Sequence, residues 1–106
     1  MPRLLVVDDE PSVLQFFRRT FQNHENLDVL TAGTAGEGLT IAKKERPDVA
    51  VFDVRLPDYD GLSLLREVQQ YDSRMPVIFI TGGGTSATAI DAMRLGAFDY
   101  LTKPLD

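Results

Sequence analysis

The chain has 106 residues, 43% of them hydrophobic and 25% charged, with a single histidine and no cysteine. This length supports one domain with one core, and the lack of cysteine excludes disulfide scaffolds, thiolate zinc sites and cysteine nucleophiles. Sixteen acidic against eleven basic residues give a net charge of -5, the wrong sign for binding a nucleic-acid backbone. No apolar run is long enough to span a membrane, so we expect one soluble cytoplasmic domain over residues 1–106 that binds neither nucleic acid nor membrane.

Short apolar runs recur along the chain and predict the strands. They cover residues 4–7, 27–30, 49–52 and 77–80, with a weaker fifth run at 98–101. Three of the first four are continuous rather than alternating, which is typical of strands covered on both faces, as in parallel sheets.

Between these runs, apolar residues recur every three or four positions, the spacing of an amphipathic helix. The first helix is expected after Pro11, which suits a first helical turn. The second follows a capping-box pair, Thr34 and Glu37, although Gly36 and Gly38 weaken it. The apolar residues that predict the four helices, in chain order, are Val13, Phe17 and Phe21, then Leu39 and Ile41, then Leu62, Leu65 and Val68, and finally Ile90 and Met93. The fourth helix is expected to end at Leu95–Gly96.

Strands and helices therefore alternate, which predicts an α/β fold with a parallel sheet, right-handed crossovers and helices on both faces. The chain stops at Asp106, directly after the fifth run, with no residues left for a helix over that strand. We expect a fragment of a longer protein, with an under-covered sheet edge and either self-association or marginal stability.

Polar residues follow four of the predicted strands, where parallel sheets bind their ligands. Each residue alone has an ordinary explanation, since acids cap helices, hydroxyls end strands and most lysines are solvated. Their joint placement on four strand ends favours a site. They are Asp8, Asp9 and Glu10 after the first strand, Asp53 after the third, Thr81 at the end of the fourth and Lys103 after the fifth.

Three converging carboxylates repel one another unless a cation compensates them. Because only oxygen ligands are on offer, the ion should be hard, with Mg²⁺ first, Mn²⁺ second and Ca²⁺ third. Such an ion beside a lysine and a hydroxyl also describes phosphoryl transfer, with Asp53 as nucleophile and Lys103 and Thr81 on the transferring group. Asp8 and Asp9 would then hold the ion.

Four segments in order carry a family resemblance: LVVDDEP at 5–11, DVRLPDYDG at 53–61, ITG at 80–82 and GAFDYLTKP at 96–104. Together they resemble the receiver domain of two-component response regulators, over the whole chain except the family's final helix. From residue 82 onward the chain is most similar to receivers of NtrC-type transcriptional activators, which carry an ATPase. The resemblance implies a flavodoxin-like (CheY-like) three-layer sandwich, with strand order 2-1-3-4-5 and the last helix absent.

The resemblance also implies roles for individual residues. A histidine kinase, a phosphotransfer protein or a small phosphodonor would phosphorylate Asp53, and the domain would be no enzyme beyond its own phosphorylation and dephosphorylation. Mg²⁺, or Mn²⁺ in its place, would be held by Asp8, Asp9, Asp53 and the backbone carbonyl of Arg55. The phosphoryl group would contact Thr81, Lys103 and the N–H of Gly82, and Tyr100 would turn inward as Thr81 moves.

This change would regulate an output domain that is absent from the sequence, a transcriptional one by the resemblance, with a homodimer as a further expected partner. The bulk of Arg55 beside Asp53 is expected to affect the entry of hydrolytic water.

Two other functions fit a sheet of this kind. A magnesium-dependent phosphatase with an aspartyl-phosphate intermediate would place its second acid two residues after the nucleophile, whereas Asp8 and Asp9 are adjacent, and it would need an added cap. A flavin-binding electron carrier would need a phosphate-binding hydroxyl loop after the first strand, where this chain has acids.

Overall fold

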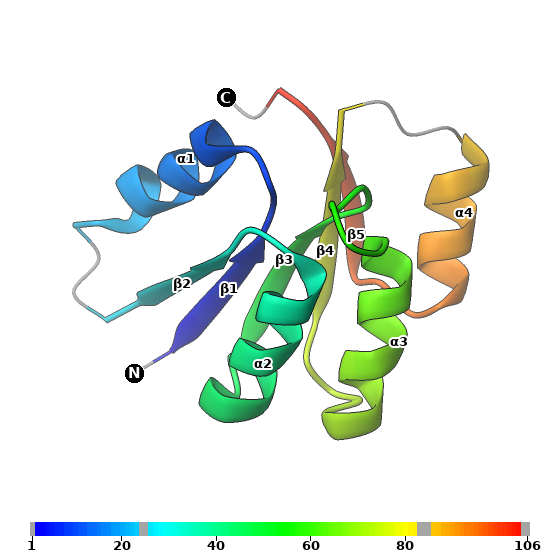
Figure 1. Cartoon of the computed structure of the whole chain (residues 1–106), viewed down its shortest axis with the longest axis horizontal. Helices are drawn as coiled ribbons and strands as arrows, with labels where there is room; N and C mark the ends of the chain where they lie inside the picture. The colour runs from blue at the N-terminus through cyan, green and yellow to red at the C-terminus, as the bar shows by residue number, and fades with distance from the viewer. Residues whose placement is uncertain (1, 24–25, 83–85, 105–106) are drawn as a thin grey trace.

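The computed structural model describes residues 2–23, 26–82 and 86–104 (Figure 1). Its five strands are all parallel and lie in the order β2-β1-β3-β4-β5, which confirms the predicted fold. The elements are β1 (Arg3–Val7), α1 (Pro11–Phe21), β2 (Asp28–Ala32), α2 (Ala35–Glu45), β3 (Val49–Asp53), α3 (Gly61–Tyr71), β4 (Val77–Thr81), α4 (Ser86–Arg94) and β5 (Asp99–Thr102).

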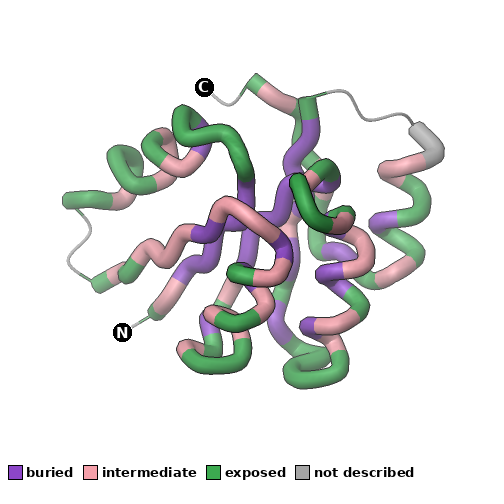
Figure 2. The backbone as a smooth tube through the Cα atoms, viewed as in Figure 1, coloured by how far each residue is buried: buried purple, intermediate pink, exposed green. Residues whose placement is uncertain are grey.

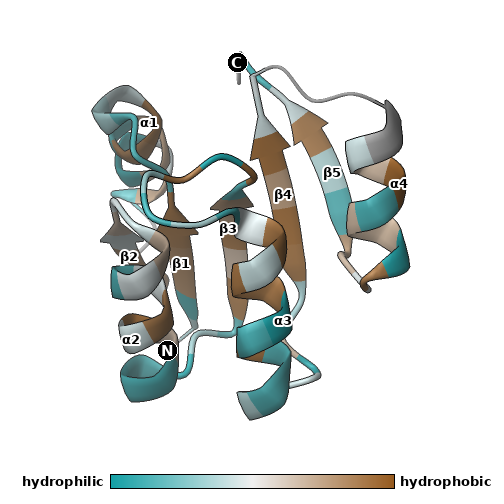
Figure 3. Cartoon of the chain, turned by 45° about the vertical axis from the view of Figure 1, so that its right-hand side comes forward, coloured by the Kyte–Doolittle hydropathy of each residue, from teal (hydrophilic) through white to brown (hydrophobic). Residues whose placement is uncertain are grey.

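The sheet separates two apolar clusters because successive strand residues point to opposite faces. On β1, Leu4 and Val6 pack with Val13 and its neighbours on α1. Leu5 and Val7 face the other way, into the larger cluster shared with α2, α3 and α4. Burial is concentrated on the central strands (Figure 2), and apolar residues run along β1 and β4 (Figure 3). One helix therefore covers one face of the sheet and three helices cover the other.

Gly38 weakens the second helix locally but allows that helix to pack closely against the sheet. Thr34 caps α2 as predicted, its hydroxyl accepting the N–H of Glu37. Gly38 faces the sheet, and a Cβ added there would come 2.6 Å from a methyl carbon of Val7. The glycine therefore lets α2 lie close against β1, at the cost of some helix propensity.

Two predictions about the later elements need correction. The second strand runs over 28–32 rather than 27–30, because its pairing with β1 extends to Ala32 opposite Val7. The fourth helix is confirmed, but the apolar residues that predicted it are not its buried face. Ile90 and Met93 are 50% and 48% exposed, whereas the small Ala92 is buried against the core.

The last strand is the least covered part of the sheet, as the sequence predicted. Leu101 on β5 is 42% exposed, and Phe98 just before the strand is 69% exposed. In the part of the chain that is described, no helix is both long and apolar enough to cross a membrane.

Candidate functional site

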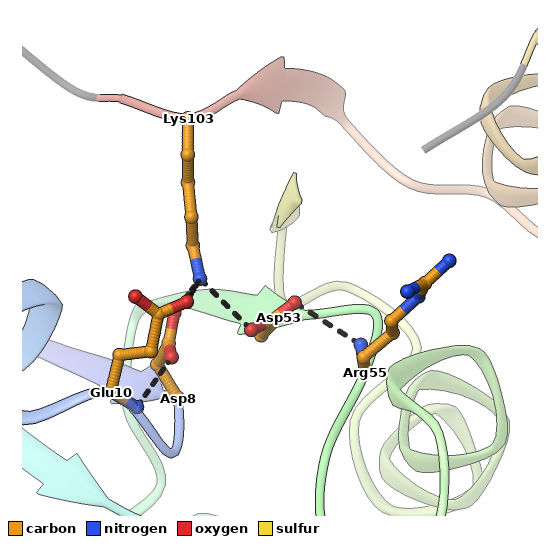
Figure 4. Close-up of polar contacts among 5 residues, drawn as sticks. All are labelled: Asp8, Glu10, Asp53, Arg55 and Lys103. Carbon is orange, nitrogen blue, oxygen red and sulfur yellow. Dashed lines mark hydrogen bonds and ion pairs between the residues drawn. The ribbon is translucent and has the colours of Figure 1, made fainter. Parts of the chain in front are cut away.

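The carboxyl ends of four strands bring the predicted side chains to one edge of the sheet, and Figure 4 shows the charged ones, Asp8, Asp53 and Lys103. Asp8 follows β1, and its N–H donates to the carbonyl of Ala32 on β2. Asp53 ends β3 and Thr81 ends β4. The N–H of Lys103 donates to the carbonyl of Thr81 at 2.8 Å, which extends the β4–β5 pairing and aims the lysine back at the sheet. The sequence prediction that these four residues meet is therefore confirmed.

Asp53, Thr81 and Lys103 line a cavity of about 380 Å³. It is open to solvent and is lined by Asp9, Glu10, Asp53, Arg55, Thr81, Gly82 and Lys103. A group of phosphoryl size can therefore reach the carboxylate of Asp53 from outside.

Lys103 is the cation of the site. Its Nζ lies 2.6 Å from Oε1 of Glu10, 3.0 Å from Oδ2 of Asp8 and 3.1 Å from Oδ2 of Asp53. Burial alone lowers the pKa of Lys103, but the carboxylates of Glu10, Asp8 and Asp53 raise that pKa by more, and the net shift is upward. The lysine is therefore charged throughout the neutral pH range.

Asp8 is the carboxylate that the fold tolerates least well. It is fully buried, its Oδ1 accepts the N–H of Glu10 at 2.9 Å, and its Oδ2 is paired with Lys103 without the alignment of a hydrogen bond. Burial raises the pKa of Asp8 to about 6, and the charge of Asp53 adds to the rise, although the Glu10 N–H and Lys103 oppose it. A second cation near Asp8 would relieve this cost.

The donor set fits such a cation. Oxygens of Asp8, Glu10 and Asp53 all lie within 4.8 Å of one another, and three carboxylates face one ammonium group. Hard oxygen ligands with this excess of negative charge suit Mg²⁺ or Mn²⁺.

Glu10 was predicted to lie at the site, but the sequence reasoning assigned the ion to Asp8 and Asp9, whereas the structure clusters Glu10 with Asp8 and Asp53. The residue before α1 is extended, and alternate residues of an extended chain share a side. Glu10 therefore joins Asp8, while Asp9 is an exposed residue lining the cavity. This alternation was the available signal. The role of Asp9 as a metal ligand stays a prediction.

Asp53 is held by the loop that follows it. The residue is 4% exposed, and its Oδ1 accepts the N–H of Arg55 at 3.1 Å. The guanidinium of Arg55 points away from the carboxylates (Figure 4). Gly61 closes the loop by donating to the carbonyl of Val54 at 2.8 Å. A Cβ at Gly61 would lie 2.2 Å from the carbonyl oxygen of Asp53, so this tight closure requires glycine.

The remaining predicted residues lie on the β4 and β5 side of the site. Thr81 is 2% exposed and Gly82 is exposed, and both line the cavity. Tyr100 pairs with Phe79 in the sheet and packs against the core below. Its hydroxyl is buried and has no hydrogen-bond partner among the described residues. The switch role of Thr81 and Tyr100 stays a prediction.

Comparison with known proteins gives a consistent result. The family model described as "Response regulator receiver domain" matches residues 4–106. The chain is 41% identical over 102 residues to the C4-dicarboxylate transport transcriptional regulatory protein DctD of Pseudomonas aeruginosa, covering 96% of this chain and 22% of that protein. It is 37% identical over 103 residues to the transcriptional regulatory protein GlrR of Escherichia coli, covering 97% and 23%. The chain thus spans less than a quarter of either relative.

Solved structures share this fold. A CheY-like receiver domain protein of Methanospirillum hungatei is similar with a TM-score of 0.92 at 32% identity, over 100% of this chain and 84% of that one. The beryllofluoride-activated NtrC4 receiver domain dimer gives 0.91 at 35%, over 100% and 87%. A Burkholderia pseudomallei response regulator, solved with a phosphorylated aspartic acid and a calcium ion, gives 0.90 at 27%, over 100% and 62%.

Proposed function

The chain belongs to the response regulator receiver domain family, and from that premise we propose that it is the phosphoacceptor switch of a two-component system, with Asp53 as the phosphorylated residue. The observation that carries this proposal is the carboxylate of Asp53. Asp53 ends the central strand, and its carboxylate faces the cavity and lies 3.1 Å from the ammonium of Lys103. The donor would be the phosphohistidine of a histidine kinase or phosphotransfer protein, or a small phosphodonor.

In the transfer, a carboxylate oxygen of Asp53 attacks the phosphorus of the donor. The new P–O bond forms as the P–N bond to the donor's imidazole breaks, and that nitrogen keeps the electron pair. Lys103 offsets the negative charge of the phosphoryl oxygens, and the hydroxyl of Thr81 and the N–H of Gly82 donate to them. All three residues line the same cavity as Asp53, which supports these roles.

The metal in this proposal is Mg²⁺, or Mn²⁺ in its place, held by Asp8, Asp9, Asp53 and the backbone carbonyl of Arg55. When bound, the ion supplies positive charge against the carboxylates and the incoming phosphoryl group. The clustered oxygens of Asp8 and Asp53 and the raised pKa of Asp8 support a cation here. Glu10 would keep its ion pair with Lys103, or exchange it for the ion.

Phosphorylation would then shift Thr81 toward the phosphoryl group and turn Tyr100 inward, changing the surface of α4 and β5. The buried hydroxyl of Tyr100, unpartnered among the described residues, is compatible with a side chain that has more than one position. To move such an equilibrium from 1:99 to 99:1 takes roughly 5.5 kcal/mol of preference for one state. A doubly charged group beside Lys103 can supply an effect of this size.

The output of the switch would be transcriptional, since the relatives are named as transcriptional regulators. A homodimer is a further proposed partner, because a similar receiver forms a dimer in its activated form. The family match favours this function over the phosphatase and flavin-carrier alternatives. In this proposal the domain catalyses only its own phosphorylation and dephosphorylation.

The test is the intact mass of the protein after incubation with acetyl phosphate and Mg²⁺. We expect one added phosphoryl group, which is absent when EDTA replaces Mg²⁺ and absent in Asp53→Asn. An adduct of equal yield in Asp53→Asn would place the phosphate on another residue and refute the proposal.

A further inference from the structure

A carboxylate outside the acidic cluster joins the loop after Asp53 to a distant helix. Asp58 lies in the loop of residues 54–60 between β3 and α3, here named the β3–α3 loop. Its Oδ1 accepts the N–H of Ala35 at 2.9 Å, and its Oδ2 accepts the N–H of Gly36 at 2.8 Å. These are the first two residues of α2, and they lie 23 and 22 positions earlier in the chain.

The contact is a cap supplied by another segment. The first N–H groups of a helix have no partner within it and carry partial positive charge. Thr34, the residue that caps α2 within its own segment, takes the N–H of Glu37. Asp58 accepts two of the remaining N–H groups, one with each carboxylate oxygen. The pKa of Asp58 is lowered, and the hydrogen bond from the N–H of Gly36 is the largest cause. Its carboxylate therefore stays ionised and bound to α2 through the neutral pH range.

The same loop carries the backbone next to the phosphoacceptor. Its first residue, Val54, donates to the carbonyl of Ile80 on β4, and its end is closed by the N–H of Gly61 on the carbonyl of Val54. Between these points the N–H of Arg55 holds Oδ1 of Asp53. Three residues after Arg55, Asp58 anchors the loop to α2. Movement of the loop away from α2 would therefore move the Arg55 backbone relative to Asp53.

We propose that Asp58 is a positioning residue that ties the β3–α3 loop to the start of α2 and so holds the backbone of Arg55 in place beside Asp53 for metal binding. The proposal rests on the proposed function in one respect, the role of the Arg55 carbonyl as a metal ligand. Because coupling between sites is reciprocal, metal bound at Arg55 should in turn tighten the contact between Asp58 and α2.

Two variants separate this tether from ordinary capping. Asp58→Asn keeps the shape of the side chain but removes its charge and turns one acceptor into a donor that faces an N–H. Thr34→Ala is the matched control, because it removes a cap from the same end of α2 without touching the loop. Both are solvent-exposed or half-buried positions at which the fold should persist.

The first readout is amide hydrogen exchange of the metal-free protein. Asp58→Asn is expected to speed exchange about tenfold both at residues 35–36 and within the β3–α3 loop, since a charge-assisted contact is lost. Thr34→Ala should speed exchange only in the first turn of α2. Faster exchange confined to α2 in Asp58→Asn would overturn the proposal.

The second readout is the dissociation constant of Mg²⁺, measured by titration of the unphosphorylated protein. We expect it to rise several-fold in Asp58→Asn and to stay at the wild-type value in Thr34→Ala. Mg²⁺ should also slow exchange at residues 35–36 in the wild type but not in Asp58→Asn. Equal Mg²⁺ affinity in Asp58→Asn and wild type would refute the positioning role while leaving the proposed function intact. A wild type that binds no Mg²⁺ would instead refute the metal site of the proposed function, and with it the positioning role.

Discussion

Replacing the buried Asp8 by asparagine is expected to stabilise the metal-free protein at neutral pH. Asp8 is fully buried, and burial raises its pKa to about 6. Asparagine keeps an oxygen to accept the N–H of Glu10, as Oδ1 of Asp8 does now. It also removes the charge that repels Asp53. A substitution in the acidic cluster should therefore raise stability, contrary to the usual effect of changing a buried, paired residue.

The size of the effect follows from the difference between a pKa of 3.8 and one of about 6. The folded protein protonates Asp8 below a pH of about 6, whereas the unfolded chain does so only below 3.8. Between these values the folded state binds more protons, so wild-type stability rises as the pH falls through this window. Above it the ionised Asp8 disfavours folding by about 3 kcal/mol, at about 1.4 kcal/mol for each pKa unit. The amide nitrogen introduced by Asp8→Asn would face Nζ of Lys103, so this value is an upper limit for the gain.

The assay is urea unfolding of wild type and Asp8→Asn in EDTA, at pH 7 and at pH 4. The gain in Asp8→Asn should be largest at pH 7 and close to zero at pH 4, where Asp8 of the folded wild type is already protonated. Asp9→Asn is the control, since this neighbouring residue is exposed and its substitution should change stability by less than about 0.5 kcal/mol. Adding Mg²⁺ should stabilise the wild type and much less the Asp8→Asn variant. A variant less stable than wild type at pH 7, or a gain that does not shrink at pH 4, would refute this reasoning.

Three further outcomes can be measured on the same preparations. Gly61→Ala should lower the free energy of unfolding by about 1–3 kcal/mol, because its Cβ would lie 2.2 Å from the carbonyl oxygen of Asp53; unchanged urea unfolding would contradict this. Arg55→Ala should shorten the lifetime of the phosphoryl group, as Arg55 lines the cavity, and equal dephosphorylation rates would exclude such a role. The exposed Phe98 and Leu101 should cause concentration-dependent self-association, seen by light scattering and reduced by Phe98→Ser; a monodisperse wild type would count against it.

The position of the site could be predicted from the sequence because parallel strands all end at the same edge of a sheet. Asp8, Asp53 and Lys103 each follow an apolar run, and the folded chain brings them within ion-pair distance. The periodicity of the runs was sufficient for this, even though the ends of individual strands were displaced by one or two residues. The ends of β2 are set by its pairing with β1, and the sequence of β2 alone does not indicate where that pairing stops.

Features that depend on the distance between two elements could not be predicted. Nothing local to Asp58 indicates that it binds the start of α2, because the two segments meet only once the sheet has formed. The need for glycine at position 38 could not be predicted for the same reason, because it arises from the close approach of Val7 on another element and not from the helix that contains Gly38. On α4, the spacing of Ile90 and Met93 predicted the helix, but the residue buried against the core is the small Ala92.

The electrostatics of the site link its instability to its proposed chemistry. Lys103 compensates one of the three carboxylates of Asp8, Glu10 and Asp53, and two negative charges remain in excess. Because the charge of Asp8 destabilises the metal-free fold, it favours the state in which a cation is bound. A ligand such as Mg²⁺ that binds only the folded state stabilises that state by an amount that grows with the ligand concentration. The gain in the free energy of unfolding that Asp8→Asn shows without metal should therefore be matched by a loss of similar size in the free energy of Mg²⁺ binding. Urea unfolding with and without Mg²⁺ measures both quantities, and a gain in stability without a loss of Mg²⁺ affinity would show that Asp8 is not part of the metal site.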